Sequence, residues 1–316
     1  MIQVKDNWTV EVLLDGEPSL VTPARLEIVI SEEINISPHV TLTILLPKDK
    51  LKVPSEVAVR YGIQELETER RFEVLQATLT PILDGYLLTV RGAFPGTKKL
   101  YSEARIAYYE GTSVDVVEQV LSAYNSVEVS ASSSDSQVWI QPNIPDKAFV
   151  DDVLLHCASK GLVRVGYQCD KFKILDLSAL SDPKLSLRSE MVPVFKSSAG
   201  LYGTKLSQPG GTLFKLADSS TGQVQGVSQF PPLFLNDNTH PKFWEAYFSG
   251  LERYAKLRDS IVEVGLTKLV DVELGDTVLV VFPGEDETIS GKYVVIGRRT
   301  RITPDGIISA LTAGRI

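Results

Sequence analysis

Alternation of apolar and polar residues with a period of two is the feature that most constrains the fold of this chain. It recurs in runs at 26–30, 40–44, 57–61 and 86–90. One apolar face repeated at every second residue is typical of half-buried antiparallel strands. Prolines and an Asp-Gly pair separate the runs, as turn residues do. Residues 1–95 are therefore predicted to form a β-barrel or a β-sandwich.

Strand patterning returns in the last part of the chain, residues 181–316. It follows a long segment rich in glycine, serine and proline at 197–241. Pro304-Asp305-Gly306 is a turn sequence, because proline presets φ and glycine accepts a positive φ. We expect the strands after Leu274 to close a sheet. Earlier in the chain, the polar stretch Gln64–Arg71 is expected to be an exposed hairpin tip.

The middle of the chain, residues 96–180, changes from strand periodicity to helix periodicity. Apolar residues at i, i+3, i+4 and i+7 from Val117 form one face of a helix. The predicted elements are a helix capped by Thr112 and Asp115, a helix that begins at the cap Asp146 and ends at Gly161, and strands over 162–167 and 172–177. These elements indicate a compact α+β unit between two β-rich regions.

A third predicted helix, over residues 242–259, carries a broad apolar face. Two interpretations are open: the face packs against its own barrel, or it makes a contact between subunits. The residues that such a contact would use are Phe243, Trp244, Tyr247, Phe248 and Leu251.

Side chains capable of catalysis are scattered and form no known motif. The histidines lack the spacing of a metal-binding helix motif. Adjacent helix residues such as His156 and Cys157 point in different directions. The side chains assigned to ordinary packing or exposure are His39, His156, His240, Cys157, Asp151, Asp152 and the acidic turn Glu285–Glu287. We therefore predict no enzymatic activity, no catalytic residue, no metal and no cofactor.

Charge and hydropathy restrict the partners further. The chain has a net charge of −8, and an acidic surface does not neutralise phosphates, so DNA would pass without specific binding. No stretch approaches the ~20 apolar residues that cross a bilayer, so no direct membrane insertion is expected. Its 2 cysteines are too few for a disulfide framework, which fits synthesis in a reducing cytoplasm.

Four short motifs, taken in their order along the chain, carry a resemblance to a known family. They are the strands from Ser31-Glu32-Glu33 to Arg71-Phe72-Glu73-Val74; the turn and helix from Tyr108 to Val117; Gln141-Pro142-Asn143-Ile144-Pro145-Asp146 through to Lys173-Ile174-Leu175-Asp176; and Leu274-Gly275-Asp276-Thr277-Val278, followed by Gly291-Lys292-Tyr293-Val294-Val295 and Gly306. In this order the chain resembles the central hub protein of contractile-tail baseplates. That family includes the late control proteins of phages and is similar to the hub part of the valine-glycine-repeat spike proteins of type VI secretion.

The resemblance implies a mainly β fold with α+β, in which two tail-tube-like β-barrel domains, 1–95 and 181–316, flank an inserted α+β domain at 96–180. It implies a homotrimeric ring that adapts the six-fold tail tube to the three-fold central spike and forms part of the DNA conduit. The partners would be the tail tube protein, a separate central spike protein and other baseplate proteins, with the tape measure protein as a further candidate. The protein would belong to a virion tail baseplate, assembled in the bacterial host cytoplasm.

Two alternatives stay open at this point. One is a β-rich cell-wall hydrolase or ligand-binding protein, with its site in the long loop at 197–241. The other is the equivalent hub of an extracellular contractile injection system, which the sequence barely distinguishes from a phage hub.

Overall fold

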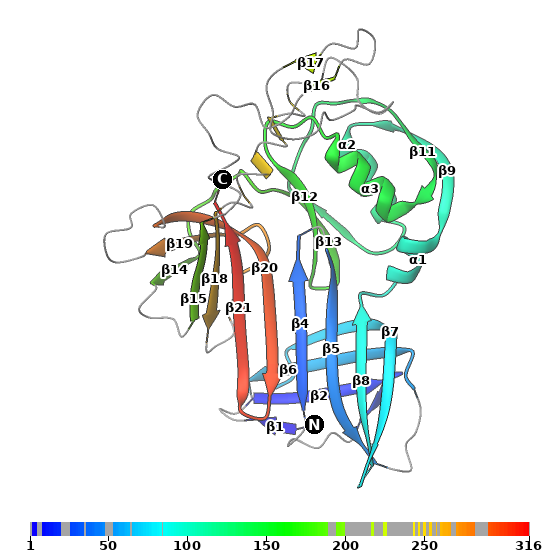
Figure 1. Cartoon of the computed structure of the whole chain (residues 1–316), viewed down its shortest axis with the longest axis vertical. Coiled ribbons are helices and arrows are strands. Elements are labelled where there is room, and N and C mark those ends of the chain that lie inside the picture. The colour runs from blue at the N-terminus through cyan, green and yellow to red at the C-terminus, as the bar shows by residue number, and fades with distance from the viewer. Residues whose placement is uncertain are drawn as a thin grey trace.

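Strands dominate the computed structural model of this protein, and its helices are short (Figure 1). The structure describes residues 2–4, 8–19, 26–34, 36–47, 53–63, 65–83, 85–188, 194–199, 216–217, 224–225, 260–266, 270–281 and 290–315, with individual residues between 243 and 257. The predicted mainly β fold with an α+β part is confirmed.

Most strands belong to one 14-stranded sheet. Its strands from the first part of the chain are β1 Ile2–Val4, β2 Trp8–Leu14, β3 Glu17–Pro18, β4 Glu27–Glu33, β5 Ile36–Leu46, β6 Glu56–Ile63, β7 Thr68–Ile82 and β8 Gly85–Ala93. Its strands from the last part are β14 Leu185–Arg188, β15 Val194–Ala199, β18 Ser260–Leu266, β19 Thr277–Val281, β20 Gly291–Thr303 and β21 Gly306–Gly314. The order is β1-β2-β6-β7-β8-β5-β4-β20-β21-β18-β15, with β3 beside β2, β19 beside β20 and β14 beside β19.

The first hydrophobic core lies between strands of the N-terminal part of this sheet. In Figure 1, β2 and β6 cross behind β4, β5 and β8, so the sheet folds back on itself. Inward-facing residues at every second position, such as Val10, Leu42 and Val59, are fully buried between the two layers. The period-two prediction for these strands is confirmed, except that β7 already begins at Thr68, inside the stretch expected to be a hairpin tip.

Pairing between β4 and β20 joins the two ends of the chain. The strands are antiparallel, with Glu33 opposite Gly297 and Ile28 opposite Ile302. Ile302 and Ile307 are buried in the first core, although all its other members precede Phe94 in the chain. The last part of the sequence therefore completes the core of the first part.

A second core fills the C-terminal part of the sheet. Val264, Val278 and Leu311 are among its buried members, and they come from β18, β19 and β21. Leu162 and Leu175, which flank the helical region, contribute to the same core. Outside the large sheet, β16 Leu216–Ala217 pairs with β17 Val224–Gln225.

The α+β region lies at one end of the molecule (Figure 1). Its elements are α1 Thr97–Ser102, β9 Ala104–Gly111, α2 Ser113–Leu121, β10 Val127–Val129, β11 Gln137–Pro145, α3 Asp146–Leu155, β12 Val163–Gln168 and β13 Lys171–Asp176. β9 pairs with β11, and β10, β13 and β12 form a second small sheet. The third core packs α2 and α3 against these strands around Trp139 and Phe149, both fully buried.

Local signals predicted one helix start correctly and one incorrectly. The Thr112 side chain caps α2 and Asp115 bonds back to the Thr112 backbone, so the expected capping box is present. Asp146 is not the cap of α3: the N-cap is Pro145, and Asp146 is the first helical residue, with its side chain buried. α3 ends at Leu155 and not near Gly161. Among the described residues, no helix has the length and apolar character to span a bilayer.

Candidate functional site

Among the described side chains considered for catalysis, His156 and Asp152 form one close pair, with Nδ1 3.3 Å from the carboxylate one helical turn earlier, and the others form no cluster with them. His39 is exposed, whereas His156 is buried with Nδ1 2.7 Å from the Asp152 carbonyl oxygen. His240 and Glu285–Glu287 lie outside the described residues. Asp151 bonds to Lys147 one helical turn away, at 2.6 Å. Among the described residues, no three His, Cys, Asp or Glu side chains are arranged to hold a metal ion.

Cys157 is a buried thiol and is 8% exposed. It follows α3 and does not lie on the helix face where the sequence placed it. Burial raises the pKa of Cys157 from 9.0 to about 12, and the nearby Asp135 acts in the same direction. The Ser113 hydroxyl lies 3.0 Å from the sulfur and acts against this shift. A thiol of this kind stays protonated at neutral pH, which is the state that favours packing over nucleophilic chemistry.

We expect Cys157 to react with a disulfide reagent only after unfolding. A pKa raised from 9.0 to about 12 lowers the thiolate fraction at pH 8 roughly 1000-fold. The measurement is the labelling rate of Cys169→Ser, which retains only Cys157, in native buffer and in denaturant. Cys157→Ser, which retains the half-buried Cys169, is the matched control. Equal native rates in the two variants would contradict the burial argument.

The predicted interface helix is only partly described. Phe243 is half-buried, whereas Trp244, Tyr247, Phe248 and Leu251 lie outside the described residues. Further along, the Tyr254 ring centroid lies 4.2 Å from the Arg164 guanidinium. Leu257 is buried in the C-terminal core. These later residues pack on their own chain, and the contact between subunits stays a prediction.

A buried charge cluster joins three parts of the molecule. Glu32 of β4 lies with its carboxylate 3.4 Å from Arg70 Nε of β7 and 3.6 Å from Arg298 Nε of β20. Cys169, in the turn between β12 and β13, donates its backbone N–H to Glu32 at 3.4 Å. The same residue accepts a hydrogen bond from Arg70 Nη2 at its sulfur, at 3.0 Å. We call Glu32, Arg70 and Arg298 the junction triad.

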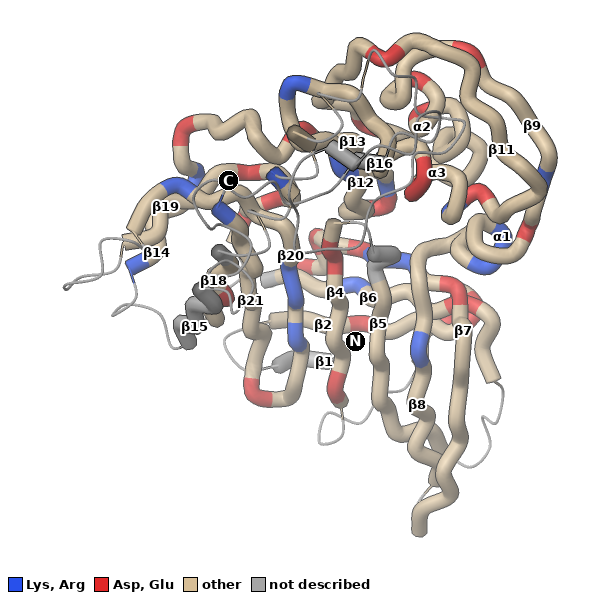
Figure 2. Tube along the Cα trace, turned by 45° about the horizontal axis from the view of Figure 1, so that its top comes forward, with Lys and Arg blue, Asp and Glu red and all other residues tan. Residues whose placement is uncertain are grey.

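The junction triad continues into the interior a pattern in which basic residues of β20 are matched with acidic residues of β4. Figure 2 shows basic residues on β20 beside acidic residues on β4. Arg301 pairs with Glu27 at 2.9 Å on the exposed part of these strands. Arg298 and Glu32 repeat the pairing in the interior, where they are 8% and 4% exposed. Sequence reasoning missed the triad, because its members are far apart in the chain.

A second buried network centres on Asp146, which is 0% exposed. Its carboxylate accepts hydrogen bonds from the Tyr124 hydroxyl at 2.6 Å and from Gln141 Nε2 at 2.8 Å, and it pairs with Arg105. Burial raises the pKa of Tyr124 to about 12, and the hydrogen bond to Asp146 adds to this shift. The network ties α3 to β9, β11 and the end of α2.

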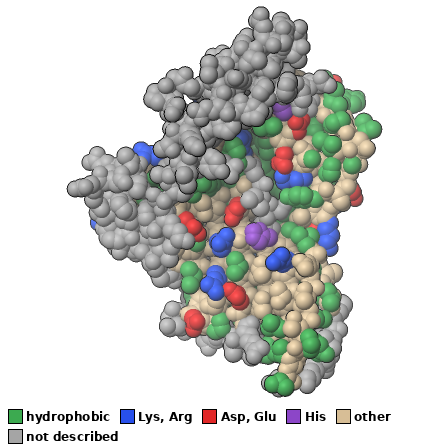
Figure 3. Space-filling model, viewed as in Figure 1, with side chains coloured by type: hydrophobic (Ala, Val, Ile, Leu, Met, Phe, Trp, Pro, Cys, Tyr) green, Lys and Arg blue, Asp and Glu red, His purple; other side chains and the backbone are tan. Residues whose placement is uncertain are grey.

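The outer face of the β9–β11 ribbon is an exposed apolar surface. Register places Ile106 opposite Pro142 and Tyr108 opposite Ile140, with the side chains of each pair on one face. Ile106 is 81% exposed, Tyr108 73%, Val138 52% and Ile140 50%. Hydrophobic side chains gather over this part of the molecule in Figure 3. Contiguous apolar surface of this kind commonly marks a contact with another molecule.

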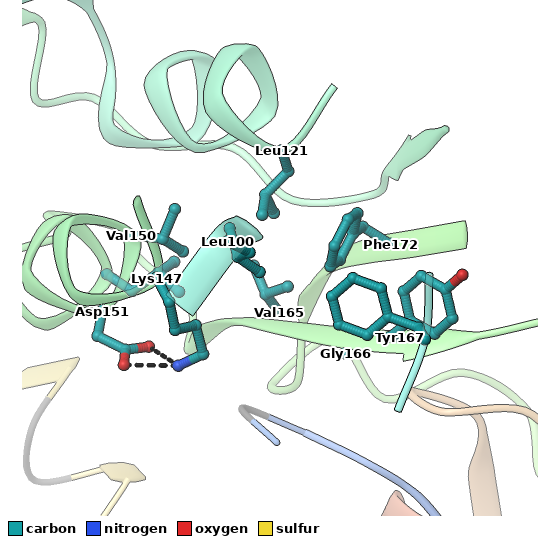
Figure 4. A pocket seen from close by; sticks show the side chains of 11 residues that line it. Leu100, Leu121, Lys147, Val150, Asp151, Val165, Gly166, Tyr167 and Phe172 are labelled. Atoms are coloured by element: carbon teal, nitrogen blue, oxygen red, sulfur yellow. Dashed lines mark hydrogen bonds and ion pairs between the residues drawn. The ribbon is translucent and has the colours of Figure 1, made fainter. Parts of the chain in front are cut away.

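The α+β region also contains a small apolar hollow, with an empty volume of about 370 Å³. Figure 4 shows Leu100, Val150 and Phe172 around it, with Lys147 and Asp151 bonded to each other at its edge. Both charged groups at the edge are occupied by their mutual ion pair, so neither is positioned as an acid or base for a substrate. The hollow lacks the convergent polar groups of a small-molecule site.

Comparison with solved structures finds proteins with the same fold over nearly the whole chain. The 43 kDa tail protein of prophage MuSo2 from Shewanella oneidensis superposes with a TM-score of 0.68, at 13% identity, over 97% of this chain and 96% of its own. A tail protein from Neisseria meningitidis MC58 gives a TM-score of 0.66 at 13% identity, over 98% and 96%. The resemblance to tail proteins drawn from the sequence is confirmed in the fold.

The same fold occurs in a secretion system. The E. coli c3393 protein, a component of the type VI secretion system with structural similarity to the T4 tail proteins gp27 and gp5, gives a TM-score of 0.60 at 12% identity. The match covers 96% of this chain and 76% of that one. No protein-family model matches the sequence, and no curated protein matches it.

Proposed function

We propose that this protein is a structural hub of a phage tail baseplate. In this proposal, three copies form a ring with six barrel-like units, which adapts the six-fold tail tube to the three-fold central spike and forms part of the DNA conduit. Its neighbours would be the tail tube protein, the central spike protein and other baseplate proteins, in a virion tail assembled in the host cytoplasm. The observation that carries the proposal is the likeness in fold to two tail proteins over at least 97% of this chain.

Two further features of the molecule support an assembly role. The apolar face of the β9–β11 ribbon is suited to burial against another protein, since a soluble monomer rarely exposes a contiguous apolar surface. The sheet that runs through both β-rich regions gives a stiff frame, because β4 and β20 are paired directly. Neither feature provides a nucleophile or a base, and both fit a protein that works by holding others in place.

The test is the assembly state of the purified full chain, together with electron microscopy. We expect a mass of three copies by sedimentation and a three-fold ring with a central opening wide enough for duplex DNA. A strict monomer at every concentration, combined with turnover of peptidoglycan, would instead support the hydrolase or ligand-binding alternative with its site at 197–241.

The hub of a contractile injection system is a second candidate, which the fold of the E. coli type VI secretion component favours. Such a hub would form the same ring and make the same contacts to the tube and the spike, but the injection system around it carries no genome. Neighbouring genes distinguish the two: capsid and terminase genes indicate a phage, whereas effector genes without a capsid indicate an injection system.

A further inference from the structure

The hairpin of β12 and β13 ends in a two-residue turn whose residues adopt an uncommon backbone conformation. Gln168 is paired with Lys171, so the turn itself consists of Cys169 and Asp170. Their φ angles are 54° and 58°, which lie in the left-handed region. The commonest two-residue hairpin turns also take a positive φ at both central residues, and they favour Asn-Gly, Asp-Gly or Gly-Gly for that reason. A cysteine in this conformation has a steric cost that glycine avoids.

The turn is inserted where the first and the last parts of the large sheet meet. Figure 1 places β12 and β13 beside the ends of β4 and β5. The Cys169 backbone N–H donates to Glu32 of β4, and the Cys169 sulfur accepts a hydrogen bond from Arg70 of β7. The preceding residue, Gln168, is 0% exposed, and its Oε1 accepts a hydrogen bond from the Leu274 backbone N–H at 2.9 Å. The tip of one hairpin therefore contacts both β-rich regions.

Further contacts along the hairpin hold it on both sides. Lys173 of β13 is 2% exposed and pairs with Glu273, in the segment before β19. A Cβ atom on Gly166 of β12 would lie 2.7 Å from Leu274 Cδ1, so a side chain at this position would displace the leucine. Toward the first part of the sheet, Gly166 forms a β-bridge with Ile34, directly after β4. The hairpin is therefore wedged between the first and the last parts of the sheet.

The same place contains buried polar atoms that lack a hydrogen-bond partner in the described part of the chain. They are Arg70 Nε, Arg298 Nε and Gln168 Nε2. Buried polar groups are normally hydrogen-bonded, and each exception needs an explanation. Backbone strain and unsatisfied polar groups both lower stability, and they persist only where the surrounding structure imposes them. Their coincidence at one hairpin tip indicates that the contacts of this turn, and not its own conformational preference, determine its position.

We propose that the turn between β12 and β13 is a conformational lock, which fixes the orientation of the α+β region on the two β-rich regions. Cys169 is its positioning residue, because its backbone contacts Glu32 and its side chain contacts Arg70. The positive φ of Cys169 persists because these contacts hold it. The lock rests only on contacts within one chain, so it does not depend on the hub function.

Cys169→Gly in the full chain tests the lock, because an ordinary turn and a lock predict opposite signs. In an ordinary turn, glycine removes the steric cost of the positive φ and raises the urea midpoint of unfolding. In a lock, the substitution also removes the sulfur that accepts the hydrogen bond from Arg70, so we expect a lower midpoint. Hydrogen exchange of the Leu274 amide, which is bonded to the Gln168 side chain, should become at least about tenfold faster, as expected when a hydrogen bond to a charged group is lost nearby.

Asn143→Gly is the matched control. Asn143 is exposed at the bulge of β11 and has a φ of 53°, so glycine relieves a positive φ there without removing a contact of the lock. Its midpoint should stay or rise, with unchanged exchange at Leu274. As a second test, Cys169→Gly should lower the midpoint less in an Arg70→Gln background than in wild type, because the two residues act together. The proposal fails if Cys169→Gly raises the midpoint, leaves the exchange of Leu274 unchanged, or has the same effect in both backgrounds.

Discussion

Glu32→Ala is expected to lower the free energy of unfolding by about 3–5 kcal/mol, because it leaves two buried arginines without their shared counter-charge. Arg298 is 8% exposed, and the Arg70 side chain is 13% exposed. Both guanidinium groups already have an Nε atom without a hydrogen-bond partner in the described structure, so they depend strongly on the carboxylate. The Cys169 backbone N–H loses its acceptor as well. Urea denaturation monitored by circular dichroism measures the change.

Glu27→Ala is the matched control for this prediction. Glu27 lies on the same strand and also pairs with an arginine of β20, but the side chains of the pair are 50% and 54% exposed. Exposed pairs contribute only about 0–1 kcal/mol. If Glu32→Ala and Glu27→Ala cost the same, the junction triad does not stabilise the contact between the three parts of the molecule.

Asp146→Ala is the second substitution with a large expected cost, again about 3–5 kcal/mol. It removes the acceptor of the Tyr124 hydroxyl and one of the two acceptors of Gln141 Nε2, and it leaves Arg105 without its ion-pair partner. Gln141 is fully buried, so its Nε2 keeps only the Ile144 carbonyl oxygen as acceptor, and water does not replace the carboxylate. Because α3 begins at Asp146, the loss should appear as unfolding of the α+β region. Hydrogen exchange in α3 and denaturation of the whole chain measure the two effects.

The same variant should change the titration of Tyr124. Burial, followed by the hydrogen bond to Asp146, raises the folded-state pKa from 10.0 to about 12. The stability that depends on protonated Tyr124 is therefore complete below pH 10 and decreases as the pH rises toward 12. Asp146→Ala should lower this pKa, measured by tyrosinate absorbance. Asp151→Ala, at an exposed carboxylate of α3, should leave both the pKa and the stability unchanged within about 0.5 kcal/mol.

Local rules predicted the features that depend on neighbours in the chain. Thr112 and Asp115 are three residues apart, and their capping box forms as the sequence indicates. Asp146 is of a residue type favoured at helix N-caps, but Arg105, Tyr124 and Gln141 surround its side chain, and this tertiary network replaces the capping role. The α3 helix also ends at Leu155, before Gly161. The residues that follow it, 156–159, are buried.

The order of motifs predicted the fold class, but the candidate surfaces could not be found in this way. Glu32 and Arg298 are opposite each other only because β4 pairs with β20 across most of the sequence. Pairing of this kind leaves no periodic signal in either strand. The ribbon had a weak signal: Ile140 is an apolar residue between two buried ones, and Tyr108 lies between two half-buried ones. Without the register of β9 and β11, the sequence does not show that these side chains share one exposed face.

The position of β20 next to β4 has a consequence for how the protein is made. Ile302 and Ile307 fill the core of the N-terminal strands, so that core stays incomplete until β20 and β21 have left the ribosome. Contacts over such separations form slowly, and unpaired strand edges are prone to wrong association in the meantime. The nascent chain would therefore expose the edge of β4 until β20 has been made, and a chaperone that shields this edge should raise the yield of native protein.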